Sequence, residues 1–254
     1  MTSVIWTQRY DVNTLVLSAQ KRLGLVGLLK ILQDVAWIHG GHLGRGFEAM
    51  MSRGWIWVLA RQKVSVSRWP TWGETLDVRT WARPINGLLF LRDYEIWSGG
   101  EKMGESTASW LVLDAETRRP VKASMDKAAL VTRSEGTLDL EPAKIAARDD
   151  LAPLARFEVR NSDLDVNGHV NNIHYAQWIL DATPAGAHRT HEVADYEVNF
   201  LAETRVGDEI AIEGELASAD PVGGLGFQGR RTGDGKIAFT ARLQARPRAA
   251  PGQP

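Results

Sequence analysis

The sequence predicts an α+β fold of two tandem units, each a long helix wrapped by a curved antiparallel sheet. Three observations predict it: two turn sequences recur at one constant interval, alternating apolar strands flank these turns, and an apolar helical stretch precedes each set of strands. The length of 254 residues suits one large domain or two small ones.

The repeated turns are the first of these observations. The stretch Trp72–Leu76 (WGETL) resembles Val206–Ile210 (VGDEI), and Ser98–Lys102 (SGGEK) resembles Thr232–Lys236 (TGDGK). In both pairs the second copy follows the first by 134 residues. Since the interval is shared, a duplicated unit explains the two matches better than chance.

The segments around the turns have strand and helix periodicity. Apolar residues alternate with polar ones at Leu76, Val78, Ala194, Tyr196, Val198, Phe200, Ile237, Phe239, Ala241 and Leu243. Helical faces recur at Leu25, Leu28, Leu29, Leu32, Val35 and Ala36, and again at Ile173, Ala176 and Leu180. We expect Gly40 and Gly41 to end the first helix, Asn171 or Asn172 to cap the second, and Pro184 to follow it.

These elements divide the chain. We place an N-terminal unit at residues 1–135, a linker at 136–153, a C-terminal unit at 154–245 and a flexible tail at 246–254. The longest apolar stretch, near residues 23–32, is far shorter than the ~18 residues of a membrane span. No signal peptide is recognisable at the start.

Composition excludes several classes of function. Lys and Arg number 30 against 31 Asp and Glu, a net charge of -1, which argues against nucleic-acid binding through a general basic field. The absence of cysteine excludes disulfides, thiolate metal sites and a cysteine nucleophile, and it suits a reducing compartment. We therefore expect a cytoplasmic protein.

One polar segment, Asn161–Asn172, stands out. Asp165, Asn167 and His169 are spaced by two, which would place their side chains on one face of an extended strand. Gly168 permits a tight backbone approach, and the helix that follows offers free N–H groups and a positive dipole end to an oxyanion. The alternative interpretation is an elaborate turn and helix cap.

The segment also resembles a known signature. Asp163–Asn172 (DLDVNGHVNN), followed by Tyr175 and Trp178–Leu180, strongly resembles that of acyl-acyl-carrier-protein thioesterases, which include plant plastid enzymes and bacterial relatives. The resemblance extends over roughly residues 1–245. It implies a double hotdog fold and an enzyme that hydrolyses the thioester of fatty acyl carrier protein, releasing free fatty acid.

The resemblance also implies the catalytic residues. The Asp, Asn and His of the family fall on Asp165, Asn167 and His169, and its Glu falls on Glu203 in a segment similar to Asn199–Thr204. Plant members carry Cys after this Glu, where this chain has Thr204, so either water or a carboxylate must attack the thioester.

Each of these residues is given a role. We assign Glu203 and His169 to the proton of water, and Asn167 to positioning the water or the thioester. Asp165 orients the loop or shares the role of base, and the backbone at Gly168 and Val170 polarises the carbonyl.

Other signals are weaker. Trp55, Trp57 and Leu59 are candidates for lining an acyl tunnel, although core packing explains them equally well. The pairs His39/His42 and His188/His191 lack a third ligand at familiar spacing, so we expect no metal and no cofactor. Asp11–Asn13 resembles Asp165–Asn167, but Leu15 stands where a His would be and the interval is not 134, so we expect one active site.

The expected partner is an acyl carrier protein bearing an acyl-phosphopantetheine arm. Arg118 and Arg119 with Lys122, or Arg230 and Arg231, could contact this acidic carrier or coenzyme A phosphates, though solvated charge is the simpler interpretation. A hotdog acyl-coenzyme A thioesterase remains an alternative, followed by a non-catalytic acyl-binding module and a hydratase. A monomer and a homodimer are both compatible with the sequence.

Overall fold

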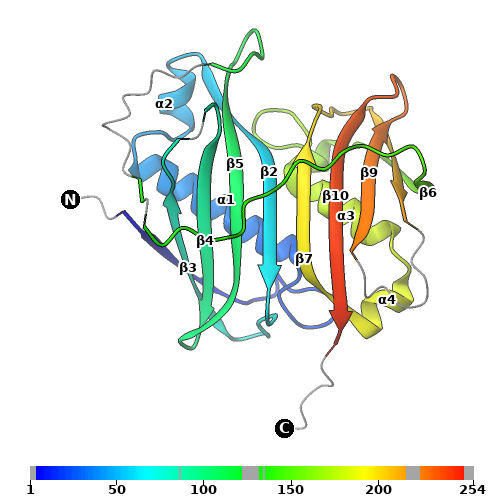
Figure 1. The fold of residues 1–254 in the computed structure, drawn as a ribbon, viewed down its shortest axis with the longest axis horizontal. Helices are drawn as coiled ribbons and strands as arrows, with labels where there is room; N and C mark the ends of the chain where they lie inside the picture. The colour runs from blue at the N-terminus through cyan, green and yellow to red at the C-terminus, as the bar shows by residue number, and fades with distance from the viewer. Residues whose placement is uncertain (1–3, 86, 122–131, 134, 216–223, 249–254) are drawn as a thin grey trace. The chain divides into compact units, whose positions relative to one another are not determined.

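The computed structural model describes residues 4–85, 87–121, 132–133, 135–215 and 224–248, and the chain forms two compact units, Met1–Pro142 and Ala143–Pro254. Within each unit one antiparallel sheet packs against one principal helix (Figure 1). The predicted α+β fold class is therefore confirmed.

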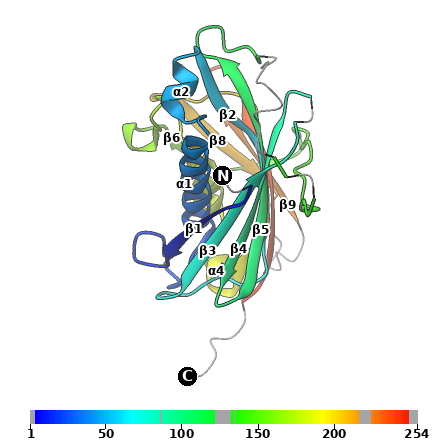
Figure 2. The ribbon, with the colours of Figure 1, turned by 90° about the vertical axis from the view of Figure 1, so that its left-hand side faces the viewer.

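The first unit places α1 across one face of its sheet, as Figure 2 shows from the side. Its elements are β1 (Trp6–Asp11), α1 (Leu25–His42), α2 (Phe47–Met51), β2 (Trp55–Val66), β3 (Thr75–Ala82), β4 (Phe90–Ser98) and β5 (Glu101–Asp114). The strands are ordered β1-β3-β4-β5-β2. The helical face predicted from the sequence is the buried one, with Leu28, Leu32 and Val35 almost wholly covered.

The end of α1 differs from the prediction. The helix passes through Gly40 and Gly41 to His42, and Gly44, at φ +67°, follows its end. The N–H of Gly44 donates to the carbonyl of Gly41, and that of Arg45 to Gly40. A glycine costs a helix only about 1 kcal/mol, so an apolar face packed on a sheet carries the helix through two of them until a left-handed residue stops it.

The second unit repeats the arrangement with a shorter helix. Its elements are β6 (Ala152–Glu158), a 3-10 turn (Asn161–Asp163), α3 (Asn172–Ala182), α4 (Ala185–Thr190), β7 (His191–Phe200), β8 (Glu209–Gly214), β9 (Leu225–Arg231) and β10 (Ile237–Pro247), with strand order β7-β10-β9-β8-β6. Asn171 caps α3 by accepting the N–H of Ile173, and Pro184 follows the end of the helix, as predicted. Tyr175 packs against Phe200 and Phe239, which fixes α3 on the sheet.

The first pair of repeated turns has the same geometry in both units, whereas in the second pair Gly99 and Gly100 have positive φ but Gly233 does not. Gly73 and Gly207 both have φ +87°, a left-handed value that favours glycine. The N–H of Gly73 donates to Val12 at 3.0 Å, and that of Gly207 donates to Val159 at 3.1 Å. The interval of 134 residues seen in the sequence therefore reflects a structural repeat.

An extended segment before β6 lies across the sheet of the second unit, on the face away from α3 (Figure 1). Asn199 accepts the N–H of Ile145 and donates to the carbonyl of Ala143, both at 2.9 Å. Gln228 binds both backbone groups of Arg148 in the same way. These side chains explain why polar groups are buried on this face of the sheet.

We expect Asn199→Ala to lower the free energy of unfolding by about 1–3 kcal/mol, because it leaves buried backbone groups of the extended segment without partners. Urea denaturation followed by circular dichroism measures the change. Gln244→Ala, at an exposed polar position of β10, is the matched control and should change stability by less than about 0.5 kcal/mol. Equal effects of the two substitutions would contradict this role of Asn199.

The boundaries of the linker and tail differ from the sequence-based ones. The units divide after Pro142, and β6 begins at Ala152, inside the range assigned to the linker. Residues 246 and 247 belong to β10 rather than to a tail, and Arg246 pairs with Glu192 at 2.9 Å. The rest of the expected tail, 249–254, lies outside the described residues. No helix in the described ranges is long and apolar enough to cross a membrane.

Candidate active site

The loop from Leu164 to Val170 is a tight turn that carries the polar residues singled out in the sequence. Leu164 and Val170 face each other in an isolated β-bridge. Inside it, the N–H of Asp165 donates to His169 at 2.8 Å, and the N–H of Gly168 donates to Asp165 at 3.0 Å. The chain reverses here, so the segment is a turn, the alternative considered for it, and not an extended strand. Gly168, at φ +73°, makes the reversal possible.

The carboxylate of Asp165 organises this turn. It accepts the backbone N–H of Asn167 at 2.8 Å and that of His169 at 3.3 Å, and the side-chain amide of Asn167 lies 3.4 Å away. An acidic side chain that binds the backbone two residues on is a common way to stabilise a turn. Of the two roles left open for Asp165, these contacts favour orientation of the loop.

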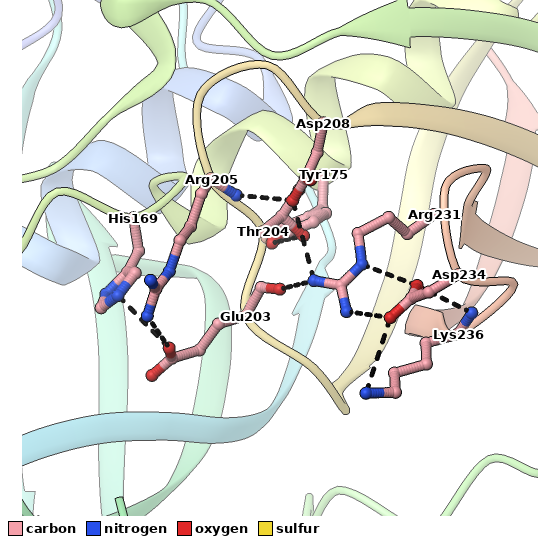
Figure 3. Close-up of polar contacts among 9 residues, drawn as sticks. All are labelled: His169, Tyr175, Glu203, Thr204, Arg205, Asp208, Arg231, Asp234 and Lys236. Atoms are coloured by element: carbon pink, nitrogen blue, oxygen red, sulfur yellow. Dashed lines mark hydrogen bonds and ion pairs between the residues drawn. The ribbon is translucent and has the colours of Figure 1, made fainter.

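His169 and Glu203 meet at the centre of the site. Glu203 follows β7, and its Oε2 lies 3.3 Å from Nε2 of His169 (Figure 3). The side chain of His169 is 16% exposed and that of Glu203 is 35% exposed. The pair is therefore held in place by its surroundings while the carboxylate stays accessible to water and substrate. Two groups that can exchange a proton are thus brought together from separate parts of the chain.

The backbone around Glu203 is fixed by residues that the sequence did not single out as catalytic. Arg231 donates from Nη1 to the carbonyl of Glu203 at 2.7 Å, and Nη2 of Arg205 lies 3.3 Å from its Oε2. Arg231 was noted in the sequence only as a possible contact for a carrier. Its actual partners are Asp234 and Asp208, which neither periodicity nor motif spacing indicates.

Thr204 occupies the position at which plant members carry Cys. It is fully buried, its Oγ1 accepts the hydroxyl of Tyr175 at 3.0 Å, and its carbonyl accepts the N–H of Val170. Burial raises the pKa of Tyr175 to about 12, so this hydroxyl stays a neutral donor. The side chain at position 204 thus binds Tyr175 while its backbone carbonyl holds the loop, which fits attack by water or by a carboxylate.

The expected oxyanion donors are otherwise engaged. The N–H of Gly168 donates to Asp165 and the N–H of Val170 donates to Thr204, so neither points to an empty position where a carbonyl oxygen could bind. In this conformation the turn itself uses both amides, and their assignment as oxyanion donors stays a prediction. The exposed side-chain amide of Asn167, whose one contact with Asp165 is long, is the donor that the loop presents.

The first unit contains a turn of the same backbone shape without the carboxylate and imidazole side chains of the candidate site. Leu17 and Leu23 form the matching bridge, and the N–H of Ser18 donates to Arg22 at 2.8 Å, as that of Asp165 does to His169. Lys21, at φ +60°, takes the place of Gly168. By these hydrogen bonds the counterparts of Asp165, Asn167, His169 and Glu203 are Ser18, Gln20, Arg22 and Trp69. The copy therefore has no carboxylate or imidazole, and Asp11–Asn13 is not the counterpart of the polar segment.

The proposed tunnel residues lie on β2. Trp55 and Trp57 are partly buried around Met50, the ring of Trp57 meets Phe90 edge-on, and Leu59 is buried. Their contact with an acyl chain stays a prediction.

One histidine of each pair has a contact within the protein. His39 is buried against Arg92, and this burial lowers its pKa to about 3. Nε2 of His188 lies 2.9 Å from the carbonyl of Leu180. Among the residues that the structure describes, no group of three or more His, Asp or Glu could hold a metal ion.

Comparison with known proteins identifies the family. Residues 3–130 match the family model of the acyl-ACP thioesterase N-terminal domain, and residues 147–243 match that of the C-terminal domain. The chain belongs to the acyl-ACP thioesterase family. The turn at Leu164–Val170 lies within the part matched by the C-terminal model of acyl-ACP thioesterases.

Plant acyl-ACP thioesterases are among the relatives that this sequence matches. An acyl-[acyl-carrier-protein] hydrolase of Cuphea viscosissima is 29% identical, over 97% of this chain and 64% of that protein. A palmitoyl-acyl carrier protein thioesterase of Cuphea hookeriana is 28% identical, over 96% of this chain and 63% of its own length. The chain thus spans just under two thirds of the length of these relatives.

Solved structures show the same fold. The 12:0-ACP thioesterase from Umbellularia californica superposes with a TM-score of 0.81 at 18% identity, over 98% of this chain and 99% of that one. An acyl-ACP thioesterase from Bacteroides thetaiotaomicron gives 0.80 at 22% identity, over 95% and 98%. These likenesses confirm the hotdog fold expected from the sequence.

The geometry of Asp165 makes a sharp prediction. Asp165→Asn keeps a side-chain oxygen that can accept the two backbone N–H groups, so we expect it to retain activity within about 10-fold. Asp165→Ala removes that oxygen and displaces His169, for which we expect a loss of roughly 10²-fold in kcat. Steady-state hydrolysis with both variants checks this. If the Asn variant were as inactive as the Ala variant, Asp165 would share the role of base instead.

Proposed function

We propose that this protein hydrolyses the thioester of fatty acyl-acyl carrier protein and releases the free fatty acid, ending chain elongation. The observation that carries the proposal is the partly exposed Glu203 within 3.3 Å of His169. The names of the Cuphea relatives, an acyl-carrier-protein hydrolase and a palmitoyl-acyl carrier protein thioesterase, support the same reaction and substrate class.

The reaction we propose uses only a few side chains. Glu203 accepts a proton from water as its oxygen attacks the thioester carbon, and the carbonyl electron pair moves onto the carbonyl oxygen. Asn167 donates a hydrogen bond to this oxyanion. When the intermediate collapses, the C–S bond breaks and its electron pair leaves with sulfur. Since a thiol has a pKa near ~8.5, the thiolate departs readily, and the proton that Glu203 took from water passes through His169 to sulfur.

Direct attack by the Glu203 carboxylate is the second route, because this carboxylate is partly exposed and so accessible to a substrate. It would form an acyl-enzyme anhydride, which water then hydrolyses. After a single turnover in H2(18)O, label in the Glu203 side chain shows attack by the carboxylate followed by hydrolysis at the Glu203 carbonyl. Attack by water and hydrolysis of the anhydride at the fatty acyl carbonyl both put the label into the fatty acid, and capture of the anhydride by hydroxylamine separates these two.

The test of the proposed function is a release assay with matched acyl groups on acyl carrier protein and on coenzyme A. We expect free fatty acid from both thioesters with a higher kcat/KM on the carrier protein. Equal or better turnover of the coenzyme A ester would make the protein an acyl-coenzyme A thioesterase. Tight binding without release would make it an acyl-binding module, and hydration of an enoyl thioester would make it a hydratase. The cytoplasmic location stays a prediction, and so does the assembly state, which is either a monomer or a homodimer.

A further inference from the structure

A hollow of about 430 Å³ opens beside the catalytic carboxylate in the second unit. It is lined by Ala202, Glu203, Arg205, Asp208, Arg231 and Lys236. Figure 3 shows His169, Arg205 and the carboxylate of Glu203 on one side of Arg231, and Lys236 on the other. The hollow therefore leads away from the proposed position of the thioester toward a lysine.

The three cations of this hollow are not equivalent. Arg231 is held by both oxygens of Asp234, at 2.8 and 2.6 Å, and its Nη1 also binds the carbonyl of Glu203. Its side chain is only 20% exposed. Its charge is thus compensated and its position fixed, so it acts as a support for Glu203 rather than as a ligand for an anion.

Lys236 differs in both respects. Its side chain is 67% exposed, and Nζ lies 3.5 Å from Oδ2 of Asp234, which already binds Arg231 at 2.6 Å. Asp208 also lies 3.7 Å from Nη1 of Arg231, so Asp234 is shared between two cations and Lys236 is the less closely compensated of the two. Arg205, whose side chain is 63% exposed, pairs with Glu203 at the other end of the hollow.

This charge pattern matches one substrate. The pantetheine arm of an acyl carrier carries its thioester at one end, neutral amides along its length and a negatively charged phosphate at the other end. We propose, resting on the proposed function, that the hollow receives this arm with the thioester at Glu203, and that Lys236 binds its phosphate. An ammonium and a phosphate form a charge-assisted contact in which lysine acts as a point charge. The same phosphate is present in acyl carrier protein and in coenzyme A.

The test compares acyl-phosphopantetheine with acyl-pantetheine, which lacks the phosphate, and uses the ratio of their kcat/KM values. We expect Lys236→Ala to lower this ratio roughly 5- to 10-fold, as for loss of one exposed charge-assisted contact. Lys236→Glu should lower it further, and Lys236→Arg should largely restore it. In the wild type the ratio should fall as salt is raised, because solvent-exposed charges are screened.

Lys144→Ala is the matched control, since Lys144 is an exposed lysine of the same unit that does not line the hollow. An unchanged ratio in both Lys236→Ala and Lys236→Glu, or an equal fall with Lys144→Ala, overturns the inference. Acyl carrier protein and acyl-coenzyme A are run in parallel to separate the sources of the phosphate. A loss with acyl-coenzyme A alone, without one on acyl-phosphopantetheine, assigns Lys236 to the nucleotide phosphates and also overturns it.

Failure of the proposed function remains distinguishable. If the wild type hydrolyses none of these thioesters, the proposed function is wrong, and calorimetry with phosphopantetheine and pantetheine then tests the inference directly. Tighter binding of phosphopantetheine to the wild type than to Lys236→Glu supports it. Equal affinities contradict it.

Discussion

Glu203→Gln is expected to lower kcat/KM for thioester hydrolysis by about 10²–10⁴-fold while leaving the fold intact. The amide has almost the shape of the carboxylate, so it can keep a polar contact with His169, now 3.3 Å from Oε2. It cannot accept a proton from water or attack as a nucleophile. The loss therefore reports the chemistry of the carboxylate and not its packing.

The matched control is Glu158→Gln, which removes an exposed carboxylate from β6 in the same unit. Both variants are compared by hydrolysis assay and circular dichroism. The double variant of Glu203→Gln and His169→Gln should be little worse than the single ones, because residues that act as a unit are strongly non-additive. Activity of Glu203→Gln within a few-fold of wild type would remove Glu203 from the mechanism.

Asp93→Ala is expected to have the largest effect on stability, lowering the free energy of unfolding by about 3–5 kcal/mol. The carboxylate of Asp93 is fully buried, and it binds Nε of Arg83 at 2.8 Å, Oγ1 of Thr107 at 2.7 Å and the N–H of Leu138 at 3.0 Å. Arg83 is only 10% exposed. Removing the carboxylate leaves the poorly solvated guanidinium with the more distant and exposed Glu141, 3.8 Å from Nη1, as its counter-charge.

Urea denaturation measures this loss, and two further variants make it specific. Asp77→Ala breaks an exposed ion pair, in which the side chain of Asp77 is 39% exposed and that of Arg9 is 71% exposed. This substitution should lower the free energy of unfolding by less than about 1 kcal/mol. Replacing both partners, Asp93→Leu with Arg83→Met, should recover part of the loss, since no unpaired charge then remains. A double variant less stable than Asp93→Ala would contradict the account based on an unpaired charge.

The sequence alone predicted much of the fold, because the signals are local. Alternation every second residue defines β7 and β10, three- and four-residue spacing defines the buried face of α1, and Asn171 caps α3 through its own side chain. The errors occurred where packing outweighs local preference. Glycine disfavours helix at Gly40 and Gly41, yet the buried face of α1 holds the helix together past them.

The candidate site divides in the same way. The residue types of the site and its turn at Gly168 could be predicted from the sequence, because side-chain chemistry and a left-handed glycine are properties of single positions. The matching turn around Ser18 could not be predicted from the sequence. Its backbone hydrogen bonds preserve the shape of the turn, but the side chains that mark the candidate site have all changed. Comparison of side chains therefore misses a repeat that comparison of backbones reveals.

What the sequence by itself determined is the family, the two-unit α+β plan and the candidate catalytic residues. Only the tertiary structure decided that His169 meets Glu203, that Arg231 holds the Glu203 backbone, and that the N–H groups of Gly168 and Val170 are already bonded. The physical reason is how far apart along the chain the interacting residues lie. Periodicity, caps and turns depend on neighbours along the chain, whereas the geometry of a carboxylate, an imidazole and their supports depends on segments that become neighbours only when the strands and the helix pack.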